Sequence, residues 1–106
     1  MPIFVLLIFT LSLFGGWRES NITAIDTIIQ TYESRLSCLQ EHEAIPCIER
    51  HPQDPRSDAL AKTFSMSFPK SYYKAKLRRD LAILKEQKLC FGKALTPQEA
   101  KACLSP

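Results

Sequence analysis

The sequence lacks the short motifs on which most catalytic and nucleotide-binding sites are built. Glycine is scarce: Gly15 and Gly16 lie in an apolar run and Gly92 stands alone, so no glycine-rich loop is available to cradle a phosphate. No Gly-x-Ser-x-Gly turn is present to expose a nucleophilic serine. Serines, acids and two histidines occur, but no spacing groups them into a catalytic set. We therefore expect a protein that is not an enzyme and carries no cofactor.

Two further absences concern cysteine chemistry and β-structure. The four cysteines contain no Cys-x-x-Cys pair, which excludes a thioredoxin-like redox motif and does not indicate a zinc ribbon. No segment sustains the alternation of apolar and polar residues that predicts a strand, and no internal repeat is present. The sequence therefore predicts an all-α protein with at most one small domain.

Charge is absent from the N-terminus, where residues 2–17 hold no charged side chain. A membrane span needs about 17 to 25 residues, so this run is short for a plasma-membrane span and sufficient for the apolar part of a signal peptide. No lysine or arginine precedes it, and neither Leu13-Phe-Gly15 nor Phe14-Gly-Gly16 has small residues at both of the positions that a cleavage site needs. Trp17 with Arg18 is typical of an interfacial anchor. We expect residues 1–17 to be a retained single-pass transmembrane anchor, with a cleaved signal as the alternative.

Residues 18–106 would then form the folded domain, at a size where a hydrophobic core alone is marginal. Two disulfides closing loops of about 10 to 14 residues would each contribute about 3 kcal/mol. An even number of cysteines behind a membrane-entry segment indicates an oxidising compartment, where disulfides form and persist.

The net charge of +3 conceals an asymmetry. Residues 70–93 hold eight basic and two acidic residues, a net charge of +6, which leaves −3 for the remainder of the chain. Cations alternate with aromatic residues at the start of this segment, as on surfaces that bind anionic lipid or acidic proteins. A simple solvated helix face is the alternative, and nucleic acid is not expected as a partner in an oxidising space. The candidate contact residues are Lys70, Lys74, Lys76, Arg78 and Arg79.

An apolar stripe with spacings of three and four residues predicts a first long helix. A capping-box pattern over residues 23–26 indicates its start, with a start nearer Asn21 as the alternative. We expect its end near Glu43 because Pro46 disfavours helical geometry at Ile45. The stripe consists of Ile22, Ile25, Ile29, Tyr32, Leu36 and Leu39.

A second stripe predicts a helix over residues 71–90, with Gly92 as its stop. After it, Thr96 followed by Pro97 and Glu99 combines a capping box with proline at the first helical position, which predicts a short last helix ending at Leu104. The stripe of the long helix consists of Tyr73, Leu77, Leu81 and Leu84, with Phe91 beyond a polar skip.

The connection between the two long helices is rich in proline. Residues 50–56 are not expected to form a regular helix. Ser57 is a candidate cap for a short helix through Lys62. Before Pro69, three apolar residues alternate and predict either a brief extended piece or plugs for the core: Phe64, Met66 and Phe68.

The four cysteines permit three disulfide connectivities, which spacing alone leaves open. In the local arrangement, Cys38 pairs with Cys47 and Cys90 pairs with Cys103, so each bridge ties the end of a long helix to the segment that follows. In the crossed arrangement, Cys38 pairs with Cys103 and Cys47 with Cys90, which clamps two antiparallel helices together.

Two cysteine pairs on a helical hairpin, in a short chain without a standard presequence, resemble the coiled-coil-helix-coiled-coil-helix proteins of the mitochondrial intermembrane space. The resemblance covers residues 38–103, and the gaps of eight and twelve residues within the pairs differ from those of the family. It implies the crossed pairing and a location in the intermembrane space.

A zinc site is a minority hypothesis. Cys38 with His42, and Cys47 with His51, are each separated by four residues and therefore share a helical face. Two thiolates and two imidazoles are a suitable set for tetrahedral zinc. The alternative is that both histidines are ordinary exposed residues.

Together these patterns predict a non-enzymatic accessory subunit or assembly factor of a membrane complex. Its disulfide-stapled helical domain would face the oxidising side, with the mitochondrial inner membrane as the favoured location. The alternative is a secreted helical disulfide protein that acts as a ligand or binding module.

Intact mass measured before and after reduction and alkylation tests this organisation. We expect a full-length mass that gains four alkyl groups only after reduction, because all four thiols are predicted to be paired. A mass lacking the first fifteen or so residues would instead support the secreted protein. Two thiols that react without reduction would support the zinc site.

Overall fold

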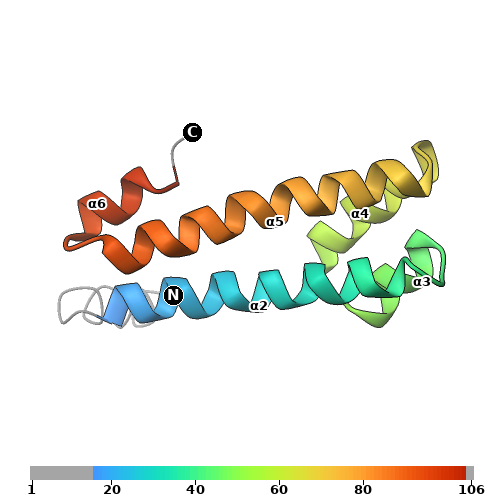
Figure 1. The fold of residues 1–106 in the computed structure, drawn as a ribbon. Coiled ribbons are helices and arrows are strands. Elements are labelled where there is room, and N and C mark those ends of the chain that lie inside the picture. The colour runs from blue at the N-terminus through green and yellow to red at the C-terminus, as the bar shows by residue number, and fades with distance from the viewer. Residues whose placement is uncertain (1–15, 105–106) are drawn as a thin grey trace. The chain divides into compact units, whose positions relative to one another are not determined.

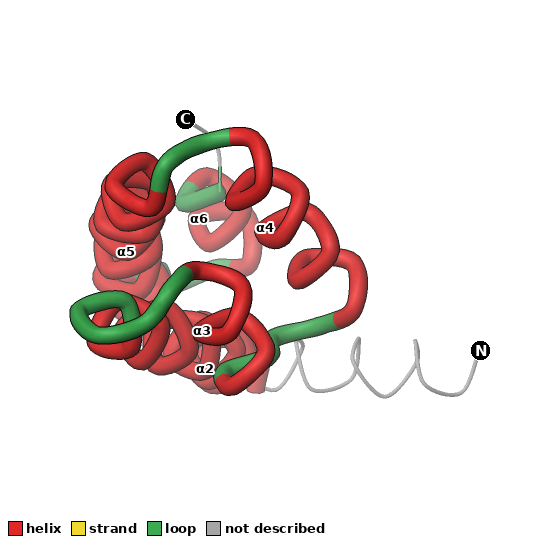
Figure 2. Tube along the Cα trace, turned by 90° about the vertical axis from the view of Figure 1, so that its right-hand side faces the viewer, coloured by secondary structure: helices red, strands yellow, loops and turns green. Residues whose placement is uncertain are grey.

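In the computed structural model, residues 16–104 are described, and all their regular structure is helical (Figures 1 and 2). No strand occurs within this range, so the prediction of an all-α protein is confirmed. The helices are α2 (Gly16–Cys38), α3 (Ala44–Arg50), α4 (Pro55–Ser67), α5 (Lys70–Lys93) and α6 (Pro97–Ala102).

The predicted N-terminal anchor, residues 1–17, lies almost wholly outside the described residues. Among the helices within residues 16–104, none is both long enough and apolar enough to cross a membrane.

The described residues divide into two compact units. The terminal unit contains residues 16–26 and 84–104, and the central unit contains Thr27–Ile83. Helices α2 and α5 each pass through both units, whereas α3 and α4 belong to the central unit and α6 to the terminal unit.

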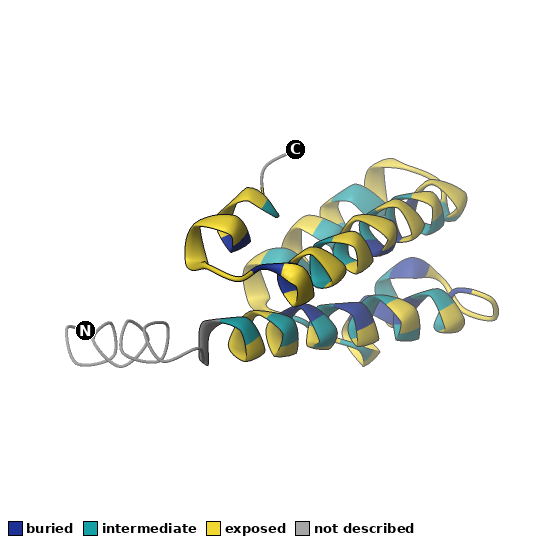
Figure 3. Cartoon of the chain, turned by 60° about the vertical axis from the view of Figure 1, so that its left-hand side comes forward, coloured by how far each residue is buried: buried dark blue, intermediate teal, exposed yellow. Residues whose placement is uncertain are grey.

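Both predicted stripes face the interior. Figure 3 shows the buried residues of α2 along one side of the helix. Ile25 and Ile29 are buried residues of α2, and Leu39, directly after the helix, is also buried. On α5 the buried residues follow the predicted spacing, because side chains three or four residues apart share a face. They are Tyr73, Leu77, Leu81 and Phe91.

The core of the central unit forms where α3 packs between the end of α2 and the start of α5. Partly buried side chains from α2 and α4 surround it, including Tyr32, Leu36 and Phe64. Burial of a side chain such as leucine or isoleucine contributes about 1.5 to 3 kcal/mol, so this cluster is the main apolar source of stability in the unit. The buried members are Leu39, Ala44, Cys47, Ile48, Tyr73 and Leu77.

Both expected ends of the first helix were wrong. Helix α2 begins at Gly16, well before the capping-box pattern at residues 23–26. Helix α2 ends at Cys38 instead of near Glu43, and Ile45 is helical although Pro46 follows it. Pro46 is the third residue of α3, within the first turn, where a backbone N–H has no partner inside the helix. The proline is therefore accommodated at the start of a new helix after a turn.

The proline-rich connection is also shorter than predicted. Helix α4 begins at Pro55 and runs to Ser67, so Phe64 and Met66 are helical, only Phe68 has extended backbone, and Ser57 is not the cap. Of the three apolar residues, Phe64 packs against the core, while Met66 and Phe68 are exposed. The cap is Asp54, whose carboxylate accepts a hydrogen bond of 2.8 Å from the backbone N–H of Ser57. Proline at the first helical position needs no N–H partner, which fixes this boundary.

The boundaries of α5 and α6 follow the predicted signals only in part. Gly92 lies inside α5, and the helix continues to Lys93. Thr96 caps α6 by accepting a hydrogen bond from the N–H of Glu99, as predicted, while the Glu99 carboxylate accepts one from the N–H of Leu95. Helix α6 itself ends at Ala102, two residues before the expected end.

One buried charge joins three helices of the central unit. The guanidinium of Arg35 on α2 is 1% exposed and forms an ion pair of 2.7 Å with Asp58 on α4. It also donates hydrogen bonds to the carbonyl of His51, at 2.9 Å, and to the hydroxyl of Tyr73 on α5, at 3.2 Å. The Asp58 carboxylate in turn accepts from the N–H of Gln53. Since buried charges are costly unless fully paired, this set of contacts fixes how the three helices meet.

Burial raises the pKa of Tyr73, while the charge and hydrogen bond of Arg35 oppose that shift. The neutral phenol is therefore the form that the folded protein favours. Because the folded-state pKa lies above the unfolded value near 10, this contribution to stability is complete below about pH 10 and is lost as the pH rises further.

Replacement of Arg35 by methionine tests the ion pair. Methionine keeps the length of the side chain but has no charge, so Asp58 loses its cation. The free energy of unfolding should therefore fall by about 3 to 5 kcal/mol. Urea denaturation followed by circular dichroism measures the loss. The control is Arg79→Met, which removes a guanidinium that is 72% exposed and should cost no more than about 1 kcal/mol. Equal losses would contradict the structural role of Arg35.

Candidate functional site

Helix α4 is the element of the central unit whose packing is least complete. None of its thirteen residues is buried, although it carries leucine, phenylalanine and methionine side chains. Leu60, on the same face as Phe64, is 66% exposed. Helices in proteins gain most of their stability from a buried apolar face, so an apolar face left in solvent indicates a surface for another molecule.

A row of aromatic rings runs from the last turns of α4 into the start of α5. The ring centroids of Phe64 and Phe68 are 4.7 Å apart, and those of Phe68 and Tyr72 are 5.7 Å apart in a stacked arrangement. Phe68 and Tyr72 remain 45% and 56% exposed. Phe64 also approaches the buried Tyr73, with 6.4 Å between centroids, which anchors the row to the core.

Two hollows flank this row, and both are lined by Phe64 and Lys76. The first has a volume of about 320 Å³, with α2 contributing Tyr32 and Arg35 and the sides coming from α4 and α5. The second, of about 360 Å³, is lined by Phe64, Tyr72, Ala75, Lys76 and Arg79. We call the two hollows together the α4–α5 groove. Apolar walls with a few charged groups are typical of sites that accept a side chain or a small ligand.

The basic residues predicted as one contact surface do not share a face of α5. Lys76 and Arg79 lie beside α4 and line the groove. At about 100° per residue, Lys74 and Arg78 lie on the opposite flank of the helix. Lys70 precedes Lys74 by four residues and lies on that same flank, and its ammonium donates a hydrogen bond of 3.3 Å to the carbonyl of His42. The predicted basic surface is thus divided, and only two of its five members reach the groove.

The groove retains a small excess of positive charge. Lys76 forms an ion pair of 2.7 Å with Asp80, four residues along the helix, and Arg79 lies 3.9 Å from the same carboxylate. One carboxylate therefore serves two cations at the rim. Arg35 lines the first hollow, but its charge is already neutralised by Asp58. The rim can consequently attract one further anionic group.

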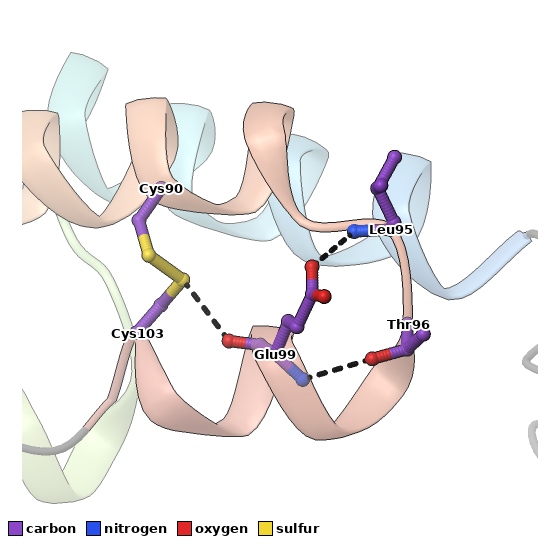
Figure 4. The surroundings of a disulfide bond; sticks show 5 residues. All are labelled: Cys90, Leu95, Thr96, Glu99 and Cys103. Carbon is purple, nitrogen blue, oxygen red and sulfur yellow. Dashed lines mark hydrogen bonds between the residues drawn. A yellow bond between two sulfur atoms is a disulfide. The ribbon is translucent and has the colours of Figure 1, made fainter.

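The structure shows the local disulfide pairing. Cys38, the last residue of α2, is bonded to Cys47 in α3, and Cys90 in α5 is bonded to Cys103 at the end of α6 (Figure 4). The predicted disulfide residues are confirmed. The crossed pairing implied by the resemblance is not found, because each pair already lies within one turn-connected segment and closes without bringing α2 and α5 together.

The zinc hypothesis is wrong for this disulfide-bonded structure. Both of its sulfur ligands, Cys38 and Cys47, are joined to each other and offer no thiolate. His42 and His51 both line a polar hollow beside Cys38. No group of three or more potential metal ligands is present among residues 16–104.

The two disulfides differ in their surroundings. Cys47 is fully buried in the core of the central unit, where Cys38 packs beside it. Cys90 is exposed and Cys103 is half-buried, and the bond between them holds a helix of six residues against α5. The first bridge is therefore part of a core, whereas the second is a surface tie.

Comparison with known proteins gives no assignment. No family model matches this chain, and no significant similarity to a curated protein or to a solved structure was found. The functional argument consequently rests on the residues and geometry described above.

The sequence interpretation missed the α4–α5 groove and the buried Arg35. A signal for α4 was present: Asp54 followed by Pro55 has the same polar-cap and proline pattern as Thr96 and Pro97. Once α4 is recognised, Leu60 and Phe64 fall four residues apart on one face. No local pattern marks Arg35, which is not a member of the apolar stripe of α2 but is buried beside it.

Limited reduction should distinguish the two disulfides. We expect a titration with reductant to open the bond between Cys90 and Cys103 first, because a thiolate must reach a sulfur atom to exchange with it. Alkylation and peptide mapping at each step give the order. The Cys90→Ser/Cys103→Ser variant should retain a resistant Cys38–Cys47 bond and nearly all its helicity. Earlier labelling of Cys38 and Cys47 would contradict the burial argument.

Proposed function

We propose that this chain is a non-enzymatic accessory subunit or assembly factor of a membrane complex, and that it binds a partner protein through the α4–α5 groove. The observation that supports binding is the exposed apolar face of α4, with Leu60 and the aromatic row bordering two hollows. Monomeric soluble proteins rarely leave contiguous apolar surface of this kind uncovered.

The proposal places the helical domain on the oxidising side of a membrane. Two disulfides support an oxidising environment, since such bonds are rare where glutathione keeps thiols reduced. Residues 1–17 would act as the anchor, on the strength of their uncharged, apolar sequence and the Trp17–Arg18 pair at its end.

The mitochondrial inner membrane is the location we propose, with the domain in the intermembrane space. The short apolar run and the basic character of residues 70–93 support it. The disulfide pairing gives no support, because it differs from the crossed pairing of the resembling family.

A secreted binding module is the second candidate. The length of the apolar run suits a signal peptide, and the same two disulfides suit a small secreted domain. In that case the α4–α5 groove would bind a soluble partner or a receptor. The fate of residues 1–17 in the mature protein separates the two candidates.

Site-specific photocrosslinking in the source organism tests the groove. A photoreactive phenylalanine analogue at Leu60 or Tyr72 should give one discrete adduct in the membrane fraction, because both positions border the hollows. Leu60→Glu should lower the yield of the same adduct from position 72 by about tenfold, because the partner would then cover a charged side chain in place of an apolar one.

Met66 provides the matched control on the same helix. It is as exposed as Leu60 but lies two residues from Phe64, which places it about 200° around the helix. The analogue at Met66 should give no adduct. Equal adducts from positions 60 and 66, or none from positions 60 and 72, would overturn the groove as the binding surface.

A further inference from the structure

We propose that the turn between α5 and α6 is a second membrane contact, in which Leu95 enters the interface of an anionic bilayer beside the N-terminal anchor. This inference rests on the proposed anchoring of residues 1–17. Its own basis is the described part of the terminal unit, where the start of α2 and the α5–α6 turn are joined.

The first step is the position of the anchor's exit. Arg18, in the first turn of α2, donates a hydrogen bond from its guanidinium to the carbonyl of Ala94. Ala94 is buried and directly precedes Leu95. The start of α2 therefore lies close enough to the α5–α6 turn for the Arg18 side chain to reach it. If residues 1–17 enter a bilayer, this turn lies at its surface.

The second step is the exposure of Leu95 itself. It is 78% exposed, the most exposed of the large apolar residues in the described chain, although its neighbour Ala94 is buried. Its side chain points away from α6 (Figure 4). The turn is held in this shape, because the Glu99 carboxylate accepts from the N–H of Leu95 at 2.8 Å and Thr96 caps α6. A leucine presented on a fixed turn is suited to insertion into an interface.

The third step is charge. Lys93 ends α5 just before the turn, and Lys101 is in the last turn of α6; both side chains are exposed. Neither forms an ion pair with another residue of the described chain. The one acid of the turn and α6, Glu99, is engaged with the backbone of Leu95. Anionic headgroups attract lysines near their surface, so this charge favours an anionic bilayer over a neutral one.

The fourth step is the tie that keeps α6 in place. The Cys90–Cys103 disulfide holds the end of α6 to α5, and Ala100 is buried between them. A helix of six residues is too short to be stable alone. With the disulfide formed, Lys101 and the turn remain fixed relative to the exit of the anchor.

Lipid quenching of a single tryptophan tests the contact in the full chain. The sequence has one tryptophan, so Trp17→Phe gives a background into which Leu95→Trp is introduced. The variant is reconstituted into phosphatidylcholine vesicles with about one-third phosphatidylglycerol, carrying brominated acyl chains. We expect a blue-shifted emission and strong quenching by the brominated lipid.

Leu60→Trp in the same background is the matched control, because Leu60 is also highly exposed but belongs to the central unit. It should show no quenching. Lys93→Glu/Lys101→Glu should reduce the quenching of the probe at position 95 several-fold, whereas Arg56→Glu on α4 should leave it unchanged.

Flotation of the vesicles separates the two ways in which the experiment can fail. Protein that floats with the vesicles while the probe at position 95 stays unquenched overturns the turn as a contact and leaves the anchor intact. Protein that does not float with the vesicles overturns both the proposed anchor and the proposed contact of the turn. Equal quenching at positions 60 and 95 also overturns the inference, because it would show general adsorption. Quenching at position 95 alone supports it.

Discussion

The central unit depends on the burial of one guanidinium. Arg35 is buried beside the apolar stripe of α2, and its contacts reach the loop after α3, helix α4 and helix α5. A leucine at this position could pack against any apolar neighbour, because its contacts are not directional. An arginine requires particular acceptors at particular distances, so the ion pair with Asp58 selects one position for α4. Specificity of arrangement is thus the contribution we assign to this charge.

This tie explains how α4 can expose so much apolar surface and still keep a defined place. The helix begins at a strong cap, Asp54 with Pro55, and is held at Asp58 and through Phe64. Ala61 also packs against the core, but no residue of the helix is fully buried. The α4–α5 groove is therefore formed by a helix that is fixed at a few points and left open between them, which suits a surface that receives a partner.

Much of the fold was predictable, because the patterns that indicate a helix lie within short stretches of sequence. The stripes of α2 and α5 and the cap of α6 depend only on residues close in sequence, and each is found in the structure. The ends of helices were less predictable: Pro46 disfavours helix in general but is accommodated in a first turn. The disulfide pairing was open between alternatives, since spacing does not determine which cysteines meet.

The candidate site was less predictable than the fold, for a physical reason. The five cations of residues 70–79 look like one surface when read along the chain, but helical periodicity separates Lys74 and Arg78 from Lys76 and Arg79. The α4–α5 groove joins residues from segments that only tertiary packing brings together. The partner of Arg35, Asp58, lies in a segment that the proline pattern made appear irregular.

The local disulfides also determine how the chain is connected covalently. One bond closes a loop between residues 38 and 47, the other between residues 90 and 103, and residues 48–89 lie outside both. A single peptide-bond cleavage in that stretch, which includes the exposed connection before α4, yields two pieces that no sulfur bridge joins. The oxidised protein is thus a linear chain with two small disulfide-closed loops. No disulfide joins its two long helices, which are held together by packing and polar contacts alone. During synthesis, each ring can close as soon as its own segment has emerged, without waiting for the other.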